Sequence, residues 1–302
     1  MGVICCKPKV KEQIIGQEMV IYNYEGNQRY DYYEKIACGA TSVVFKVYDL
    51  NESTNKICKR INRKYFRKAF REINILKKIQ TSNNNYLLKL TDVINLEDYI
   101  KLIFPYYESI DLHYLFFDKQ NIELKKIFNF KKSKIMNDMA ICIREFQKFN
   151  LVHLDIKMEN FIITINGQLK LIDYGTAHLK TNLCKNLSTV VGTKSYSAPE
   201  IYTRKYHNNS DIWSLGVCYW MMLFYCWCFD HTNIYKNNYT EDDKFKFFEF
   251  PNEYHNKKFN QNNDELKTFF SNIFKINPFE RLSICEICEF KFNKYIDNDK
   301  NN

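Results

Sequence analysis

Three polar side chains near the middle of the chain have the types and spacing for chemistry on phosphate groups. Asp155 and Asn160 lie in the stretch VHLDIKMEN, and Asp173 follows the short apolar run LKLI. Two strand-like runs around the turn Asn166-Gly167 separate Asn160 from Asp173, so a hairpin brings both side chains to one end. Carboxylate and amide oxygens are the ligands that Mg²⁺ prefers. A nearby Asp155 carboxylate orients a hydroxyl, so the pattern predicts phosphoryl transfer.

The elements that must position these groups change in character along the chain. Short β-like runs occur between residues 30 and 104, including VVFKVY at 43–48 and YIKLIF at 99–104, and one helical pattern lies at 66–79. From residue 111 onward helical patterns dominate, apart from the hairpin. Residues 1–29 are polar and basic with weak periodicity, which indicates a tail. The predicted fold class is α+β, with a β-rich first part and a mostly α-helical remainder.

The composition limits the classes of partner. The 302 residues allow one large domain or two modest ones. Lys and Arg outnumber Asp and Glu by 44 to 35, which favours acidic partners such as nucleotides or anionic lipid. No basic helix, zinc-finger spacing or Arg-rich arm supports nucleic-acid binding. The 11 Cys and the lack of a signal-peptide pattern indicate reduced thiols and a cytoplasmic protein. Cys285 and Cys288 form a CxxC without a second pair, which favours a structural helix face over a metal site.

One apolar run, WSLGVCYWMMLFYCWCF at 213–229, is long enough for two interpretations. It is close to the shortest length that spans a bilayer, roughly 17 residues. A helix that is apolar on all sides is also found at the centre of a large domain. Asp211 and Asp230 lie beside the run without a closely flanking basic cluster, which favours the buried helix and no transmembrane span.

Several motifs in a fixed order resemble the protein kinase family over residues 30–296. They are HLDIKMEN, which resembles the catalytic loop, DYG at 173–175, GTKSYSAPE at 192–200, DIWSLG at 211–216 and NPFER at 277–281. The resemblance implies a bilobal fold, with an N-lobe at 30–105, a C-lobe at 108–296 and a polar C-terminal tail at 297–302. It also supports the buried-helix interpretation of the apolar run, and it implies that Arg281 pairs with Glu200.

The resemblance also implies roles for individual residues. Asp155 is the expected catalytic base, and Lys157 is expected to stabilise the transferring phosphoryl group. Asn160 and Asp173 are expected to hold Mg²⁺. Lys59 is expected to anchor the phosphates of ATP with Glu72 as its ion-pair partner. The residues expected around ATP are Ile36, Gly39, Val44, Ile57, Lys59, Phe104, Pro105, Tyr107, Asp111, Ile162 and Asp173.

Departures from the family pattern concern the nucleotide. The glycine loop IACGATSVVFKV keeps Gly39, while Ala37 and Ser42 replace the flanking glycines, and Ile57 replaces a small Ala above the adenine. These changes favour an alternative, a pseudokinase scaffold with weak or no phosphotransfer. Phe104 is the expected gatekeeper, with a carbonyl of Pro105 and an NH of Tyr107 offered to adenine. Asp111 has two interpretations, a ribose contact and a helix N-cap.

The catalytic loop and the late motifs indicate the acceptor. Lys157, two residues after Asp155, resembles the Ser/Thr form DxKxxN, and Thr193 agrees with it. Glu159 indicates basic residues in a protein substrate. The GTKSYSAPE segment suits a peptide platform and disfavours a small-molecule kinase. Leu154 replaces an Arg that pairs with a phosphorylated activation loop in many kinases, which predicts that phosphorylation at 188–189 is not required for activity.

The N-terminal MGVICCKPKVK has two interpretations. Gly2 begins a myristoylation-like sequence, although Cys6 replaces the usual Ser or Thr, and Cys5 and Cys6 are candidates for palmitate. Lysines at 7, 9 and 11 add an electrostatic signal toward anionic lipid. Together these features predict peripheral membrane association of a cytoplasmic kinase. The alternative is an ordinary disordered start with two exposed thiols.

Overall fold

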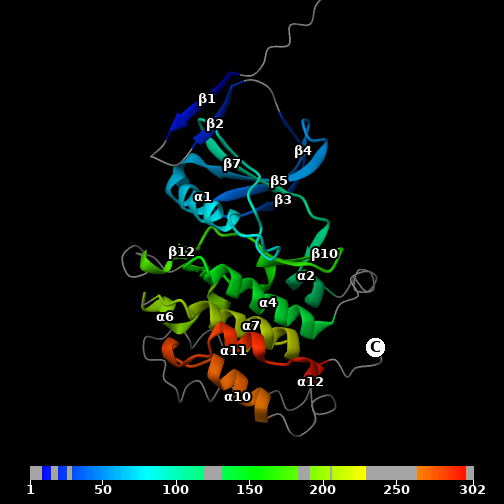
Figure 1. Ribbon diagram of the computed structural model, residues 1–302, viewed down its shortest axis with the longest axis vertical. Coiled ribbons are helices and arrows are strands. Elements are labelled where there is room, and N and C mark those ends of the chain that lie inside the picture. The colour runs from blue at the N-terminus through cyan, green and yellow to red at the C-terminus, as the bar shows by residue number, and fades with distance from the viewer. Residues whose placement is uncertain are drawn as a thin grey trace, which may run out of the picture. The chain divides into compact units, whose positions relative to one another are not determined.

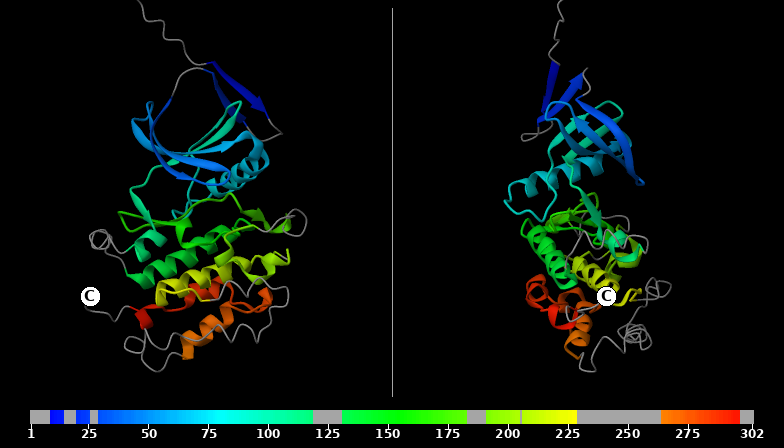
Figure 2. Two further views of the ribbon diagram at one scale, coloured as in Figure 1. Left: turned by 180° about the vertical axis from the view of Figure 1, so that it is seen from behind. Right: turned by 90° about the vertical axis from the view of Figure 1, so that its right-hand side faces the viewer.

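A computed structural model describes residues 9–14, 20–25, 29–118, 131–182, 191–204, 206–228 and 264–296 (Figures 1 and 2). The chain divides into two compact units. The first comprises Met1–Asn83 and Leu88–Tyr107, and the second comprises Asn84–Leu87 and Glu108–Asn302.

The first unit is built on a sheet. In the described part of the chain this sheet has seven strands in the order β1-β2-β6-β7-β5-β4-β3, with a parallel pairing only between β2 and β6. The strands are β1 (Lys9–Ile14), β2 (Val20–Glu25), β3 (Tyr30–Cys38), β4 (Ser42–Asp49), β5 (Thr54–Asn62), β6 (Asp92–Asn95) and β7 (Tyr99–Pro105). The expected strands at 43–48 and 99–104 are thus present as β4 and β7.

One face of this sheet is covered by helix α1 (Phe66–Gln80), which follows the short 3-10 helix η1 (Arg63–Tyr65). Its buried side chains recur mostly at spacings of three or four residues and form one face, Ala69, Glu72, Ile73, Ile75, Leu76 and Ile79. Figure 1 shows α1 in cyan beside the strands. The helix predicted at 66–79 is therefore confirmed.

Strands β1 and β2 lie within residues 1–29, where the sequence indicates a tail. They pair antiparallel from Lys9↔Glu25 to Ile14↔Val20, and β2 continues the sheet through Tyr22↔Ile94. Strand pairing of this kind uses backbone groups, which every residue except Pro carries. Polar composition and weak apolar periodicity therefore do not reveal it.

The second unit is largely helical. Its helices are α2 (Leu112–Phe117), α4 (Lys132–Gln147), α6 (Pro199–Tyr202), α7 (Ser210–Phe224), α10 (Asp264–Ile273), α11 (Ile284–Glu289) and α12 (Asn293–Ile296). Its short 3-10 helices are η2 (Met158–Asn160), η3 (Lys180–Asn182), η4 (Lys194–Tyr196) and η5 (Pro278–Glu280). Its strands are β8 (Ser109–Asp111), β9 (Leu151–Val152), β10 (Phe161–Thr164), β11 (Leu169–Leu171) and β12 (His178–Leu179). A sheet with one helix followed by a largely helical region confirms the predicted α+β fold class.

Helix α7 is the centre of the second unit. Every residue from Ser210 to Phe224 is buried, and α4 and α10 pack against the helix (Figure 2). Any side chain at Gly216 would clash with Ile273 of α10, so this glycine permits the close approach of the two helices. The helix ends at Phe224 and is capped by Tyr225, whose φ is 54°. The apolar run is therefore a buried helix, as predicted.

Among the residues that the structure describes, no helix is long and apolar enough to cross a bilayer.

A short segment, Asn84–Leu87, leaves the first unit and belongs to the second. Leu87 forms a parallel bridge with Leu171 of β11, and the Leu171 amide donates to the Tyr86 carbonyl at 2.8 Å. The Nζ of Lys170, a buried residue, donates to the Asn85 carbonyl at 2.7 Å. These contacts add the segment to the edge of the β10–β11 hairpin, which carries the predicted magnesium ligands.

Candidate active site

The loop that contains Asp155 is held by helix α7. The buried carboxylate of Asp211, in the first turn of α7, accepts the backbone amides of His153 and Leu154, both at 2.8 Å. Burial raises the pKa of Asp211, and the His153 ring and the two backbone donors oppose that rise. A buried carboxylate with two amide donors fixes the chain path immediately before Asp155. The sequence motif DIWSLG places Asp211 at the start of the helix but does not reveal this contact.

Asp155 lies among three polar groups. The Thr193 hydroxyl donates to Asp155 Oδ1 at 2.7 Å and accepts from Lys157 Nζ at 3.1 Å. Lys157 Nζ also lies 3.1 Å from Asp155 Oδ2, and Asn160 Nδ2 donates to the Asp155 carbonyl at 2.8 Å. The structure thus brings the three predicted residues of the loop together and adds Thr193, whose contact with the carboxylate the sequence does not reveal. Together these contacts fix the orientation of the Asp155 carboxylate.

The hairpin brings the second predicted magnesium ligand to the same loop. The Ile172 amide donates to the Asn160 carbonyl at 2.9 Å, so Asp173 follows directly beside Asn160. Asp173 is exposed and has a φ of 59°, and its Oδ1 accepts the Gly175 amide at 3.2 Å. Asn160 donates its Nδ2 to Asp155. The other polar atom of its side chain is the amide oxygen Oδ1, the atom that a metal ion would bind. One amide and one carboxylate oxygen donor fit Mg²⁺, which completes its shell with water and phosphate oxygens.

Tyr174 explains how the DYG motif is anchored. Its ring stacks on Phe146 of α4 with centroids 5.3 Å apart, and its hydroxyl donates to the Leu171 carbonyl at 2.7 Å. The side chain is almost fully buried. A buried hydroxyl requires a partner, and the β11 carbonyl supplies it. The buried Tyr174 side chain therefore anchors the chain directly after Asp173.

Leu154 lies where the family resemblance expects an Arg. The residue is buried and has a φ of 63°, in the left-handed region. Any side chain at Gly192 would clash with the Leu154 carbonyl, so the GTKSYSAPE segment approaches this loop closely through a glycine. Residues 188 and 189, the candidate phosphorylation sites, lie outside the described residues.

In the first unit, the predicted phosphate anchor is an ion pair. Lys59 Nζ of β5 lies 2.7 Å and 2.9 Å from the two carboxylate oxygens of Glu72 on α1. Glu72 is only 3% exposed. The predicted pairing is confirmed.

The other nucleotide residues of the first unit share the Lys59 face of the sheet. Val44 is the Cα partner of Lys59, and Ile57 is the partner of Phe104, so the alternation of strand side chains places these four on one face. Ile57 is half-buried there. Pro105 ends β7 opposite Lys56, and burial raises the pKa of Tyr107.

The glycine loop joins β3 to β4. The Gly39 amide donates to the Ser42 carbonyl at 2.9 Å, and a Cβ at Gly39 would lie at ordinary contact distance from that oxygen. Ala37 pairs with Val44, and Ile36 is 50% exposed.

Two further predicted residues lie on neighbouring strands of the second unit, with Ile162 of β10 opposite Asp111 of β8. Asp111 is the N-cap of α2, because its Oδ1 accepts the Tyr114 amide at 2.8 Å. The N-cap interpretation of Asp111 is thus observed, and the ribose contact stays a prediction.

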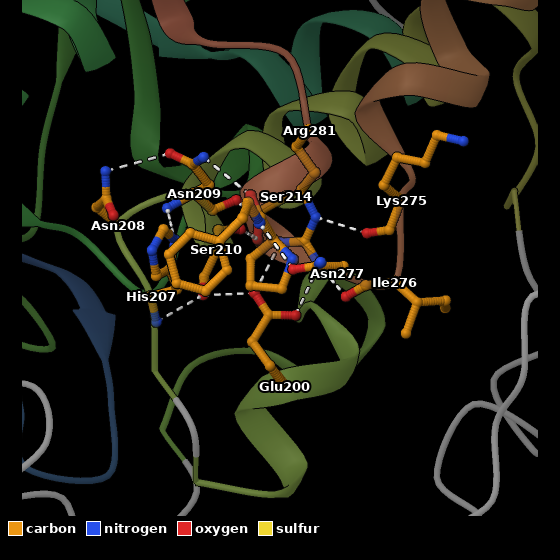
Figure 3. A network of polar contacts seen from close by, with 12 residues as sticks. Glu200, His207, Asn208, Asn209, Ser210, Ser214, Lys275, Ile276, Asn277 and Arg281 are labelled. Carbon is orange, nitrogen blue, oxygen red and sulfur yellow. Dashed lines mark hydrogen bonds and ion pairs between the residues drawn. The ribbon is translucent and has the colours of Figure 1, made fainter.

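The pair predicted between Glu200 and Arg281 is confirmed and buried (Figure 3). Both guanidinium Nη atoms lie 2.7 Å from a Glu200 carboxylate oxygen. The remaining guanidinium contacts go to three backbone carbonyls, those of Asn209, Lys275 and Ile276. The Ser210 hydroxyl also donates to Glu200 at 2.7 Å. This network ties the end of the GTKSYSAPE segment to helix α7 and to the chain before α11.

The fold and these sites define a class. Residues 30–293 match the protein kinase domain family, which is most of the chain, and the chain belongs to that family.

Three curated relatives show the range of similarity. Calcium-dependent protein kinase 6 of Plasmodium berghei is 30% identical over 228 residues, 69% of this chain and 14% of the relative. Serine/threonine-protein kinase Nek3 of Mus musculus is 32% identical over 163 residues, 49% of this chain and 31% of the relative. Dual specificity protein kinase zak2 of Dictyostelium discoideum is 33% identical over 169 residues, 52% of this chain and 23% of the relative. The chain thus matches less than a third of the length of each relative.

Proposed function

We propose that the protein transfers the γ-phosphoryl group of ATP to Ser or Thr hydroxyls of protein substrates. The observation that carries the proposal is the arrangement around Asp155, in which Lys157, Asn160 and Thr193 all contact one residue. A scaffold that performs no chemistry has no requirement for this set. The kinase family supports ATP and Mg²⁺ as cofactors.

The proposed mechanism assigns each residue a separate task. The Asp155 carboxylate orients the substrate hydroxyl and accepts its proton. Lys157 lies beside that carboxylate and stabilises negative charge on the transferring group. Asn160 and Asp173 would hold Mg²⁺, which when bound would supply positive charge against the phosphates. Lys59, held by its ion pair with Glu72, anchors the phosphates. Most of the rate gain then comes from alignment and electrostatic stabilisation.

Preference for Ser and Thr is the finer part of the proposal. Lys157 and Thr193 support it because the lysine and the threonine hydroxyl interact directly. Glu159 is exposed, and its carboxylate lies 3.4 Å from the Tyr196 hydroxyl, which leaves an anionic group at the surface for basic residues of a substrate.

The test is transfer of radiolabelled phosphate from ATP to a basic Ser/Thr peptide in the presence of Mg²⁺. Asp155→Asn is the matched control, because it keeps the shape of the side chain and removes the base. Transfer by the parent that exceeds the variant by orders of magnitude supports the proposal. Equal, background-level transfer by two folded proteins contradicts it and favours the pseudokinase alternative, to which Ala37, Ser42 and Ile57 point. A matched tyrosine peptide tests the hydroxyl preference.

A further inference from the structure

Two cations and three aromatic rings form a closed circuit of contacts in the first unit. The Arg60 guanidinium carbon lies 4.9 Å from the Phe45 ring centroid and 5.1 Å from that of Tyr99. Lys101 Nζ lies 5.8 Å from the Tyr99 centroid and 5.1 Å from that of Tyr32. Tyr32 and Phe45 meet edge to face at 5.1 Å and close the circuit. We call these five residues the cation–aromatic ring.

The cation–aromatic ring lies on the sheet face opposite the Lys59–Glu72 pair. Arg60 follows Lys59 in β5 and is the Cα partner of Lys101 in β7. Because successive strand side chains point to opposite faces, Arg60 points away from α1. Tyr32 and Phe45 pack against a buried apolar cluster on this face that includes Cys58. The cation–aromatic ring therefore forms the partly exposed surface above that cluster.

The two cations of the ring lack an acidic partner. Within the described parts of the chain, neither Arg60 nor Lys101 contacts a carboxylate. Asp92 of β6 lies opposite Ile103, on the face of Lys101, and it is held by Arg29 and the Tyr30 hydroxyl. Burial and the charge of Arg60 lower the pKa of Lys101. Like charges at directly opposed strand positions repel, so an anion that contacts both is electrostatically favoured.

We propose that the cation–aromatic ring binds a phosphorylated Ser or Thr side chain of a partner protein. A phosphate dianion carries enough charge for both cations, whereas one carboxylate carries half of it. The guanidinium offers a planar fork to two phosphate oxygens, and the ammonium of Lys101 adds a point charge. The rings beside the cations give apolar contact to the rest of a peptide, which free phosphate does not bring.

A peptide also suits this surface better than a lipid bilayer. Glu97 and Asp98 are exposed in the turn that precedes Tyr99 of the ring. A planar anionic membrane that approached Arg60 and Lys101 would also meet these carboxylates and be repelled. A single phosphate on an extended peptide contacts the cation–aromatic ring without them.

The test measures binding of short phosphoserine and phosphothreonine peptides from a random-sequence array, each with an unphosphorylated twin, to the full chain without ATP. We expect a subset to bind only when phosphorylated, and Arg60→Gln/Lys101→Gln to weaken these peptides about 10- to 100-fold. The matched control is Arg67→Gln/Lys68→Gln, which removes the same two residue types from the exposed surface of α1 and is expected to bind as the parent does. Because ATP is absent, the outcome is independent of phosphotransfer.

Three results would overturn the proposal: that no peptide binds, that phosphorylated and unphosphorylated twins bind equally, or that both double variants bind the phosphopeptides equally weakly. Competition by inorganic phosphate at the same concentration as the peptide would show a free-anion site instead. Binding of phosphatidylserine vesicles that is lost in Arg60→Gln/Lys101→Gln, without peptide binding, would show a membrane surface. If that variant fails to fold, as judged by its melting temperature, Arg60→Lys keeps the charge, loses the fork and is expected to bind more weakly than the parent.

Discussion

Replacing Glu200 by Gln is expected to destabilise the second unit by about 3 to 5 kcal/mol, the cost of breaking a buried ion pair. Gln keeps the volume of the side chain and one acceptor oxygen. Its amide group, however, faces a guanidinium donor, so one of the two 2.7 Å contacts with Arg281 is lost. The Arg281 side chain is 0% exposed, and its guanidinium remains charged without a counter-ion.

The tryptophans make this prediction measurable in one unit. All three tryptophans of the chain, at 213, 220 and 227, belong to the second unit. The Trp213 ring centroid lies 5.1 Å from the Arg281 guanidinium carbon. Urea unfolding followed by tryptophan emission therefore reports the stability of the second unit.

A second ion pair of the same unit provides the control. Glu265 lies 3.6 Å from Lys294, and both side chains are 56% exposed. Glu265→Gln is expected to leave the unfolding midpoint unchanged within error, because solvent screens exposed pairs. If Glu200→Gln costs less than about 1 kcal/mol, the range of surface pairs, the reasoning from burial is refuted.

Three further predictions concern the nucleotide, the activation segment and the N-terminus. Ile57→Ala is expected to lower the KM for ATP roughly tenfold, because the side chain shares the face of Lys59; a higher KM in steady-state kinetics would contradict this. Ser188→Ala/Thr189→Ala is expected to retain the activity of the parent, because Leu154 cannot pair with a phosphate; a collapse of kcat would show otherwise. Gly2→Ala is expected to move the protein from the membrane to the supernatant fraction, and unchanged partitioning would exclude myristate as the anchor.

Features that depend on a local pattern of side-chain types were predictable from the sequence. The stripe of apolar residues defines α1, and the alternating runs define β4 and β7. The pairs Lys59–Glu72 and Glu200–Arg281 followed from the resemblance, because each residue occupies a motif of its own. For Asp111 the sequence offered two interpretations, and the observed cap is the one that depends on residues nearby in the chain.

Contacts between distant segments were not predictable in the same way. Asp211 accepts backbone amides that lie 57 and 58 residues earlier in the sequence, and backbone donors carry no residue type. The contact between Thr193 and Asp155 depends on the close approach of two loops, which the glycine at 192 permits. Strands β1 and β2 pair through the backbone as well. In each case the contact depends on the three-dimensional arrangement of the chain and does not produce a recognisable local sequence pattern.

The placement of Asn84–Leu87 in the second unit has a consequence for synthesis on the ribosome. Asn85 and its partner Lys170 are 85 residues apart in the sequence. At translation rates of about 5 to 20 residues per second, the segment waits roughly 4 to 17 seconds for this partner. Once β7 has been made, the sheet of the first unit has all of its strands, while Leu87, almost fully buried in the final structure, still has no hairpin to cover it. The nascent chain therefore passes through a stage in which the apolar side chain of Leu87, in the loop between α1 and β6, is uncovered and is a natural point of contact for chaperones.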